Sequence, residues 1–242
     1  YTHALGKTGK EMQSIAASND GGKTWSPYKS NPVLPNPGIK DFRDPRVLWH
    51  GPSSQWVMVL AAGDRAPIYT STDLKSWKKA GAFGPITGLP RDAVWECPEL
   101  FTLPTPDGKG ERWVFKIDLN MGFGKGGSHG RYWLGSFDGA AFSVNGAASG
   151  ARLDGGEDFY AAQTFSNTSG GRRVWIGWMG SWQYSLQTPG STWRGAMSLP
   201  RELSLILDGA QEVLVQRPAA ELLNLRGACA PLLSAGPDTL SG

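Results

Sequence analysis

Two short acidic motifs carry the residues best suited to chemistry, Phe42-Arg43-Asp44-Pro45 and Trp95-Glu96-Cys97-Pro98. In the first, the guanidinium of Arg43 favours the ionised Asp44 carboxylate, and the proline fixes the direction of the following chain. In the second, apolar neighbours favour a protonated Glu96, as a general acid requires. Cleavage of a glycosidic bond with retention uses two carboxylates in such different environments. From these residues alone, Asp44 is predicted to be the nucleophile and Glu96 the acid.

Each motif taken singly also fits a structural role. Asp44 fits a turn with a surface ion pair, and such pairs contribute little to stability. Glu96 fits the end of a strand with its carboxylate in solvent. The presence of both motifs in one chain favours the catalytic interpretation.

Short strands are the elements predicted to position these residues. Segments 55–60, 112–117 and 173–178 are rich in β-branched and aromatic residues and are bounded by Gly, Pro or polar residues. Gly (33) and Pro (17) make up about a fifth of the 242 residues, which predicts many turns. Helical periodicity is nearly absent, so the chain is predicted to be all-β.

A weak repeat relates these strands to one another. The segment Ser18–Trp25 recurs in outline as Ser71–Trp77 and again as Gly135–Phe142. In each, an Asp can accept backbone N–H groups within a turn, and the aromatic residue that follows can fill the space between sheets. The intervals suit one four-stranded unit each, which favours a β-propeller over a sandwich. About three to four blades are expected, so the propeller is predicted to be partial.

The pattern changes after Glu202. Segments 203–207 and 212–216 predict a hairpin, and Pro218–Arg226 fits a short helix or a linker. The tail from Gly227 is small, apolar and rich in Pro and Gly, as at a domain junction. The predicted organisation is a catalytic domain over 1–217, followed by a linker and the start of a second domain over 218–242.

Composition excludes several classes of function. The net charge of +3 is small, and no Lys/Arg cluster alternates with aromatic residues, so no nucleic-acid partner is predicted. The longest apolar run, 56–62, is too short to span a bilayer, so no membrane partner is predicted either. The 11 Trp suit stacking on sugar rings or packing in a core.

Cofactor sites are not predicted. The two cysteines, Cys97 and Cys229, lie far apart and are predicted to be free thiols. The histidines are isolated, and no cluster of His, Cys and carboxylates would hold a metal ion; they are His3, His50 and His129. Neither a metal nor an organic cofactor is expected.

Five motifs in a fixed order resemble glycoside hydrolase family 32, and most closely its levanase, inulinase and invertase group. They are Phe-Arg-Asp-Pro (42–45), Trp-Glu-Cys-Pro (95–98), Asp-Phe-Tyr-Ala (158–161), Gly-Trp-Met (177–179) and Trp-Arg-Gly-Ala-Met-Ser-Leu-Pro-Arg-Glu-Leu (193–203). The resemblance runs from about Gln13 to Arg226. It implies a five-bladed β-propeller with a funnel-shaped site, followed by a β-sandwich.

The resemblance also implies roles that revise the local interpretation. Asp44 corresponds to the family's transition-state stabiliser, which binds the fructose hydroxyls, and Glu96 to its general acid/base. Arg43 would orient the sugar and hold Asp44 ionised, and Trp178 would lie against the fructosyl ring. At the rim of the pocket the resemblance places two further residues, Asp158 and Tyr160. Equally, Asp158 fits a turn and Tyr160 fits packing within a blade.

One family motif is missing. The nucleophile of the family lies in an Asn-Asp-Pro-Asn-Gly segment, and no Asn-Asp-Pro occurs here. Asn19-Asp20 is followed by Gly21-Gly22 and belongs to the repeated turn, so Asp20 is not assigned as nucleophile. The chain is expected to be an internal fragment, and on its own it is expected to release no fructose from sucrose, inulin or levan.

The function expected for the intact enzyme is hydrolysis of terminal β-D-fructofuranosyl units of levan, inulin or sucrose by double displacement. Because fructan polymers do not cross membranes, the enzyme is expected to be secreted. Three alternatives remain open: a fructosyltransferase of the same family, a fructan-binding or inactive fragment, and a sialidase-like hydrolase. The last is suggested by the turn at Ser18–Trp25, although the Arg triad and Tyr nucleophile of sialidases cannot be assembled from this sequence.

Overall fold

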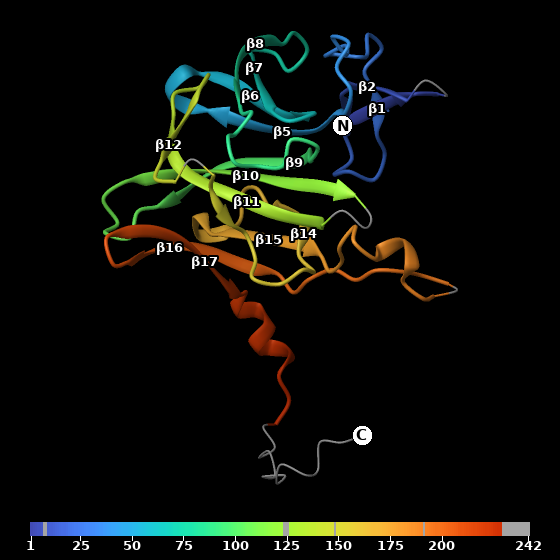
Figure 1. The fold of residues 1–242 in the computed structure, drawn as a ribbon. Coiled ribbons are helices and arrows are strands. Elements are labelled where there is room, and N and C mark those ends of the chain that lie inside the picture. The colour runs from blue at the N-terminus through green and yellow to red at the C-terminus, as the bar shows by residue number, and fades with distance from the viewer. Residues whose placement is uncertain (7–8, 123–125, 148, 191, 229–242) are drawn as a thin grey trace.

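The chain folds into antiparallel β-sheets that follow one another in sequence order, seen in a computed structural model (Figure 1). The structure describes residues 1–6, 9–122, 126–147, 149–190 and 192–228. The first four-stranded sheet has the order β5-β6-β7-β8, comprising Phe42–His50, Gln55–Ala62, Ala66–Ser71 and Lys78–Phe83. Each strand pairs with the next along the chain, as expected for a propeller blade.

Two further sheets repeat this meander. The second has the order β12-β11-β10-β9, with β13 also paired to β11; its strands are Val94–Pro104 (β9), Glu111–Gly122 (β10), Gly127–Phe137 (β11), Phe142–Asn145 (β12) and Ala151–Arg152 (β13). The third has the order β14-β15-β16-β17, comprising Tyr160–Thr164, Arg173–Trp178, Arg201–Asp208 and Gln211–Pro218. The predicted hairpin after Glu202 is therefore confirmed as β16 and β17.

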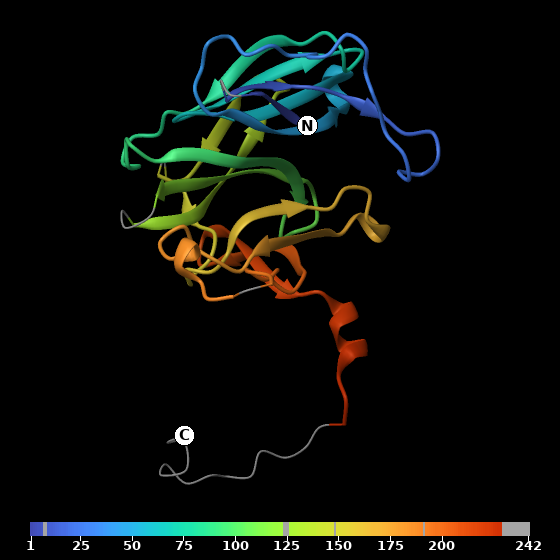
Figure 2. The ribbon, with the colours of Figure 1, turned by 90° about the vertical axis from the view of Figure 1, so that its right-hand side faces the viewer.

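The N-terminal part forms two smaller pairs. These are β1 (Thr2–Leu5) with β2 (Lys10–Gln13), and β3 (Ala16–Ala17) with β4 (Ser26–Pro27). They lie beside the first sheet, and the three large sheets are stacked one after another (Figures 1 and 2). The all-β, propeller-type architecture expected from the sequence is thus confirmed, with three sheets of blade form among the described residues.

Within the described ranges, helical structure is confined to short 3-10 turns. The longest, Ala220–Leu225, follows β17 and lies beyond the third sheet, away from the first (Figure 2). The others are Gly51–Ser53, Ser169–Gly171 and Ser185–Gln187. No helix in the described part of the chain is both long and apolar enough to cross a membrane.

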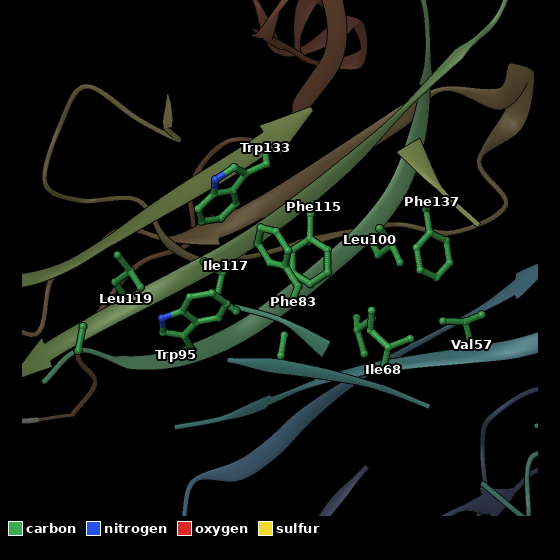
Figure 3. Packing of buried hydrophobic residues seen from close by; sticks show 13 residues of the cluster. Val57, Ile68, Phe83, Trp95, Leu100, Phe115, Ile117, Leu119, Trp133 and Phe137 are labelled. Carbon is green, nitrogen blue, oxygen red and sulfur yellow. The ribbon is translucent and has the colours of Figure 1, made fainter. Parts of the chain in front are cut away.

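Apolar residues fill the space between neighbouring sheets. The first cluster joins the first and second sheets through buried side chains that include Ile68, Phe83, Trp95 and Phe115 (Figure 3). The rings of Phe83 and Phe115 lie 4.5 Å apart between centroids. A second cluster, which includes Phe101 and Trp175, joins the second and third sheets. Burial of these faces is what fixes one sheet against the next.

The repeated Asp turns form as predicted. Asp20 accepts the backbone N–H of Thr24 at 2.9 Å, Asp73 accepts that of Ser76 at 2.8 Å, and Asp138 accepts that of Ala141 at 2.7 Å. The expectation for the aromatic residues is only partly met. Trp77 and Phe142 pack against core clusters, whereas Trp25 is 63% exposed. Its turn lies at the two-stranded β3-β4 pair, where the described residues provide no second sheet to cover the indole.

Phe115 gives a direct test of this core. Truncating it to Ala removes a fully buried ring from the first cluster, and we expect the free energy of unfolding to fall by about 3–5 kcal/mol. Urea unfolding followed by Trp fluorescence measures the loss. Leu207→Ala is the matched control, because Leu207 is exposed and its truncation should change stability little. Equal losses in the two variants would contradict this account of the core.

Candidate active site

The first strands of the three sheets bring the predicted residues together. Asp44 lies on β5, Glu96 on β9 and Tyr160 on β14, each close to the beginning of its strand. Strand β9 packs against both β5 and β14. Residues far apart in the sequence therefore meet at one end of three adjacent strands.

Each of these three strands contains a β-bulge near its beginning. On β5 the register shifts between Arg43 and Arg46, and on β14 between Tyr160 and Gln163. On β9 it shifts between Glu96 and Glu99, which pair with Asp118 and Lys116 of β10. Each bulge contains one residue other than glycine with positive φ: Asp44 (58°), Cys97 (48°) and Ala161 (54°). Such conformations are uncommon and cluster at functional sites, where bulges redirect side chains. The prolines of the two acidic motifs fall within the bulges, where no ladder hydrogen bond is needed.

Glu96 occupies the centre of a hydrogen-bonded cluster. Its Oε1 atom accepts a hydrogen bond from Arg43 Nη2 at 2.8 Å. Its Oε2 atom accepts one from the Tyr160 hydroxyl at 2.6 Å and one from Asn120 Nδ2 at 3.3 Å. The carboxylate is only 14% exposed. The expectation of apolar surroundings is therefore wrong, because the bulges turn Glu96 towards polar groups from two neighbouring sheets and its own.

Arg43 joins three carboxylates. Besides Glu96, its guanidinium contacts Asp41 at 2.7 Å and Glu11 at 3.3 Å. Burial by itself lowers the pKa of Arg43, but the hydrogen bonds to Asp41 and Glu96 outweigh this effect and raise it. The side chain is thus a fixed positive charge beside Glu96.

Asp44 is not held by Arg43, which corrects the expectation from the sequence. Its Oδ2 atom accepts the backbone N–H of Cys97 at 2.9 Å and lies 3.7 Å from the Cys97 sulfur. Its own N–H donates to the Thr2 hydroxyl at 3.0 Å. The left-handed backbone at Asp44 directs its carboxylate to the β9 bulge, while Arg43 reaches Glu96.

The Cys97 thiol, in the second acidic motif, lies beside the Asp44 carboxylate of the first. Burial raises its pKa, and nearby Asp44 and Glu96 carboxylates contribute in the same direction. It is a free thiol, as predicted. The corresponding prediction for Cys229 concerns a position outside the described residues.

The Tyr160 hydroxyl donates a hydrogen bond to Glu96. This contact supports a role for Tyr160 in the site rather than a role in packing within the blade alone. Burial raises the pKa of its hydroxyl, and the negative charges of Asp118 and Glu96 raise it further. The hydroxyl therefore remains a hydrogen-bond donor. Trp178 lies beside it, with the ring centroids 6.4 Å apart, and also packs edge-on against Trp182.

Asp158 is the one predicted residue that the structure leaves outside this cluster. It is exposed in the loop before β14, and its carboxylate accepts a hydrogen bond from the Tyr184 hydroxyl. No described contact joins it to Arg43, Asp44 or Glu96. A cavity of about 590 Å³ borders Tyr184 and Trp178, so Asp158 lies near this edge of the site. Another cavity, of about 760 Å³, is lined by Trp25, Arg46 and other residues but not by Glu96.

Neither Asn120, which contacts Glu96, nor the buried residues Lys116 and Asp118 behind the site were identified from the sequence. These three residues occupy every second position of β10, with apolar residues between them. Lys116 and Asp118 are the two charged residues in the otherwise apolar run Val114–Leu119. That alternation is the signal in the sequence that marks one polar face of a buried strand. Among the described residues no group of His, Cys, Asp and Glu side chains is arranged to hold a metal ion.

We expect the Tyr160 hydroxyl to support the chemistry at Glu96. Tyr160→Phe removes a hydrogen bond to a carboxylate worth about 1.5–3 kcal/mol, so kcat should fall about tenfold to a hundredfold. Steady-state kinetics of the full-length protein measures this. Tyr132→Phe is the matched control, because that hydroxyl contacts the backbone of Leu214 rather than the site. Unchanged kcat in Tyr160→Phe would remove the residue from the catalytic machinery.

The fold is of the propeller type, and Asp44 and Glu96 lie together where its first strands meet. The family model of the "Glycosyl hydrolases family 32 N-terminal domain" matches residues 1–218. The chain therefore belongs to glycosyl hydrolase family 32.

Individual relatives agree with this membership. The levanase of Bacillus subtilis (strain 168) is 47% identical over 225 residues, covering 91% of this chain and 33% of the levanase. The crystal structure of exo-inulinase from Aspergillus awamori superposes with a TM-score of 0.77 at 38% identity, covering 90% and 46% of the two chains. The E230A fructofuranosidase from Schwanniomyces occidentalis complexed with fructosylnystose gives 0.80 at 33% identity, covering 90% and 42%. The chain thus spans less than half the length of each of these relatives.

Proposed function

We propose that the full-length protein carrying this chain is a retaining β-fructofuranosidase that releases terminal fructosyl units from levan, inulin or sucrose. The observation that carries the proposal is the Glu96 carboxylate, which lies between Arg43 and the Tyr160 hydroxyl in a family 32 chain. The identity to a levanase and an exo-inulinase supports fructan as the substrate.

The proposed mechanism assigns a role to each residue of the site, and Glu96 acts first as an acid and then as a base. Glu96 protonates the oxygen of the departing sugar, while an aspartate of the family's Asn-Asp-Pro segment, a motif that the printed sequence lacks, attacks the anomeric carbon. Glu96 then removes a proton from the water that releases fructose. Asp44, held by the Cys97 N–H, stabilises the positive charge that develops on the fructosyl ring. Arg43 and Tyr160 fix the two oxygens of Glu96 in place.

The aromatic residues next to this cluster suit a sugar ligand. Trp178 lies beside Tyr160, and the adjoining cavity is also bordered by Tyr184 and Trp193. Flat aromatic faces beside polar groups suit rings that have one apolar face and many hydroxyls. We assign Trp178 to the fructosyl ring on this basis, with Asp158 at the rim. Secretion is proposed because a fructan polymer does not cross membranes, and the related Aspergillus awamori enzyme is named an extracellular exo-inulinase.

Product analysis tests the proposal. The purified full-length protein is incubated with sucrose, inulin and levan, and the products are separated by anion-exchange chromatography. Free fructose as the main product, first formed in the β-configuration, is the expected result. Absence of fructose from all three substrates would refute the proposal, and predominant formation of longer fructosyl oligomers would assign the protein as a transferase.

A further inference from the structure

A buried ion pair lies directly behind the candidate site. Lys116 and Asp118 are two residues apart on β10 and therefore lie on the same face of the sheet. Both side chains are fully buried, with an exposed fraction of 0%, and Lys116 Nζ donates to Asp118 Oδ2. Charged residues are almost never buried to this extent unless they are paired.

The pair contacts two of the three bulges. Lys116 Nζ donates to the backbone carbonyl of Cys97 at 3.1 Å and to that of Ala162 at 3.0 Å. A backbone hydrogen bond from Ala161 favours the ionised form of Asp118. Cys97 follows Glu96 in the β9 bulge, and Ala161 and Ala162 follow Tyr160 in the β14 bulge. One ammonium group thus joins the backbone of two sheets at the residues that position Glu96 and Tyr160.

Stability alone does not account for this arrangement. Burying two charges is costly, and apolar residues of similar shape commonly stabilise a core equally well or better. Asp118 also keeps one oxygen, Oδ1, without a hydrogen-bond partner in the described part of the chain. Burial raises the pKa of Asp118 to about 6, even though Lys116 opposes the effect. What the pair supplies, and an apolar pair would lack, is a donor for the two bulge carbonyls.

We propose that Lys116 and Asp118 are positioning residues: Lys116 clamps the β9 and β14 bulges together, Asp118 holds Lys116 in place, and the clamp keeps Glu96 and Tyr160 in hydrogen-bonding contact. This inference rests on the proposed function for its kinetic consequence. The backbone at Cys97 and Ala161 has positive φ, and such conformations persist only where surrounding contacts hold them. Loss of the clamp lets the bulges relax and moves Glu96 away from its productive position.

The test replaces the pair with apolar residues of similar shape, Lys116→Met together with Asp118→Leu, in the full-length protein. The double change avoids leaving one buried charge without its partner. We expect kcat on sucrose to fall about tenfold to a hundredfold, because a misplacement of about 1 Å can cost a hundredfold in rate. KM should change by less than about twofold, since substrate-binding groups remain. The amide of Cys97, which donates to Asp44, should exchange its hydrogen faster than in the unchanged protein.

The matched control is Arg112→Met with Glu212→Leu. This second ion pair joins the same strand, β10, to β17 at 2.6 Å and lies outside the site, so kinetics and Cys97 exchange should stay unchanged. If the apolar Lys116–Asp118 replacement does not fold, Lys116→Gln with Asp118→Asn is measured in its place by the same two readouts.

Unchanged kcat together with unchanged Cys97 exchange in a folded variant overturns the clamp, as does a rise in KM with kcat retained. Measurements on the unsubstituted protein distinguish a failure of the proposed function from a failure of the clamp. Failure of that protein to hydrolyse any fructoside refutes the proposed function, whereas the exchange rate of the Cys97 amide still reports on the clamp without requiring turnover.

Discussion

Glu96→Gln should lower kcat on sucrose, inulin and levan by about a hundredfold to ten-thousandfold in the full-length protein, because the amide supplies no acidic proton to the leaving sugar. The fold should survive. Gln keeps oxygen and nitrogen atoms near Arg43 and Tyr160, and Arg43 retains its contacts with Asp41 and Glu11. Initial rates and the thermal unfolding midpoint measure the two effects separately.

The leaving group provides a further check on the role of Glu96. A p-nitrophenyl β-D-fructofuranoside departs without needing a proton, so the first step should suffer much less in Glu96→Gln than with sucrose. Glu11→Gln is the matched control. It removes another carboxylate from the same guanidinium, and because this pair is partly solvated, kcat should change by less than about fivefold. An unfolded Glu96→Gln protein, or one that retains its kcat, would count against the assigned role.

Asp44→Asn should lower kcat by about a hundredfold to a thousandfold, with a smaller change in KM. The reason is electrostatic, because the amide no longer opposes the positive charge of the transition state with a full negative charge. Asn is the appropriate replacement here: it tolerates the positive φ of 58° at this position, and its carbonyl can still accept the N–H of Cys97. Steady-state kinetics on sucrose provides the measurement.

Asp41→Asn serves as the control for Asp44→Asn. Asp41 has nearly the same backbone conformation, with φ of 57°, and it contacts Arg43 rather than the β9 bulge. The same chemical change three residues away should therefore cost much less activity. Similar losses in the two variants would mean that Asp44 acts through the shared loop structure and not through its charge on the substrate.

The candidate site shows where local reasoning was insufficient. From its neighbours in sequence, Glu96 was expected among apolar groups and Asp44 beside Arg43. In the structure Arg43 contacts Glu96, and Asp44 contacts the Cys97 backbone. Adjacent residues on a regular strand point to opposite faces, and the bulges alter that alternation at each motif. No feature of a short motif specifies which group from another sheet will lie opposite it.

The aromatic residues lead to a similar conclusion. Trp175 lies in a predicted strand, and Trp25 is the aromatic residue after the first Asp turn, so both are predicted to pack in the core. In the structure Trp175 is fully buried, whereas Trp25 is largely exposed. The difference depends on whether a second sheet covers the residue. A propensity acts within a few residues of the chain, whereas burial depends on segments far away in sequence.

The sequence by itself determined the strands, the Asp turns at Asp20, Asp73 and Asp138, the hairpin after Glu202 and the family motifs, because these depend on residue type and on spacing within a few residues. The tertiary structure alone decided the partners of Glu96, the separation of Asp158 from the cluster and the burial of Lys116 with Asp118. Those features arise where the first strands of three sheets meet. Their physical cause is the packing of one sheet against the next, which brings together side chains and backbone groups that no local pattern relates.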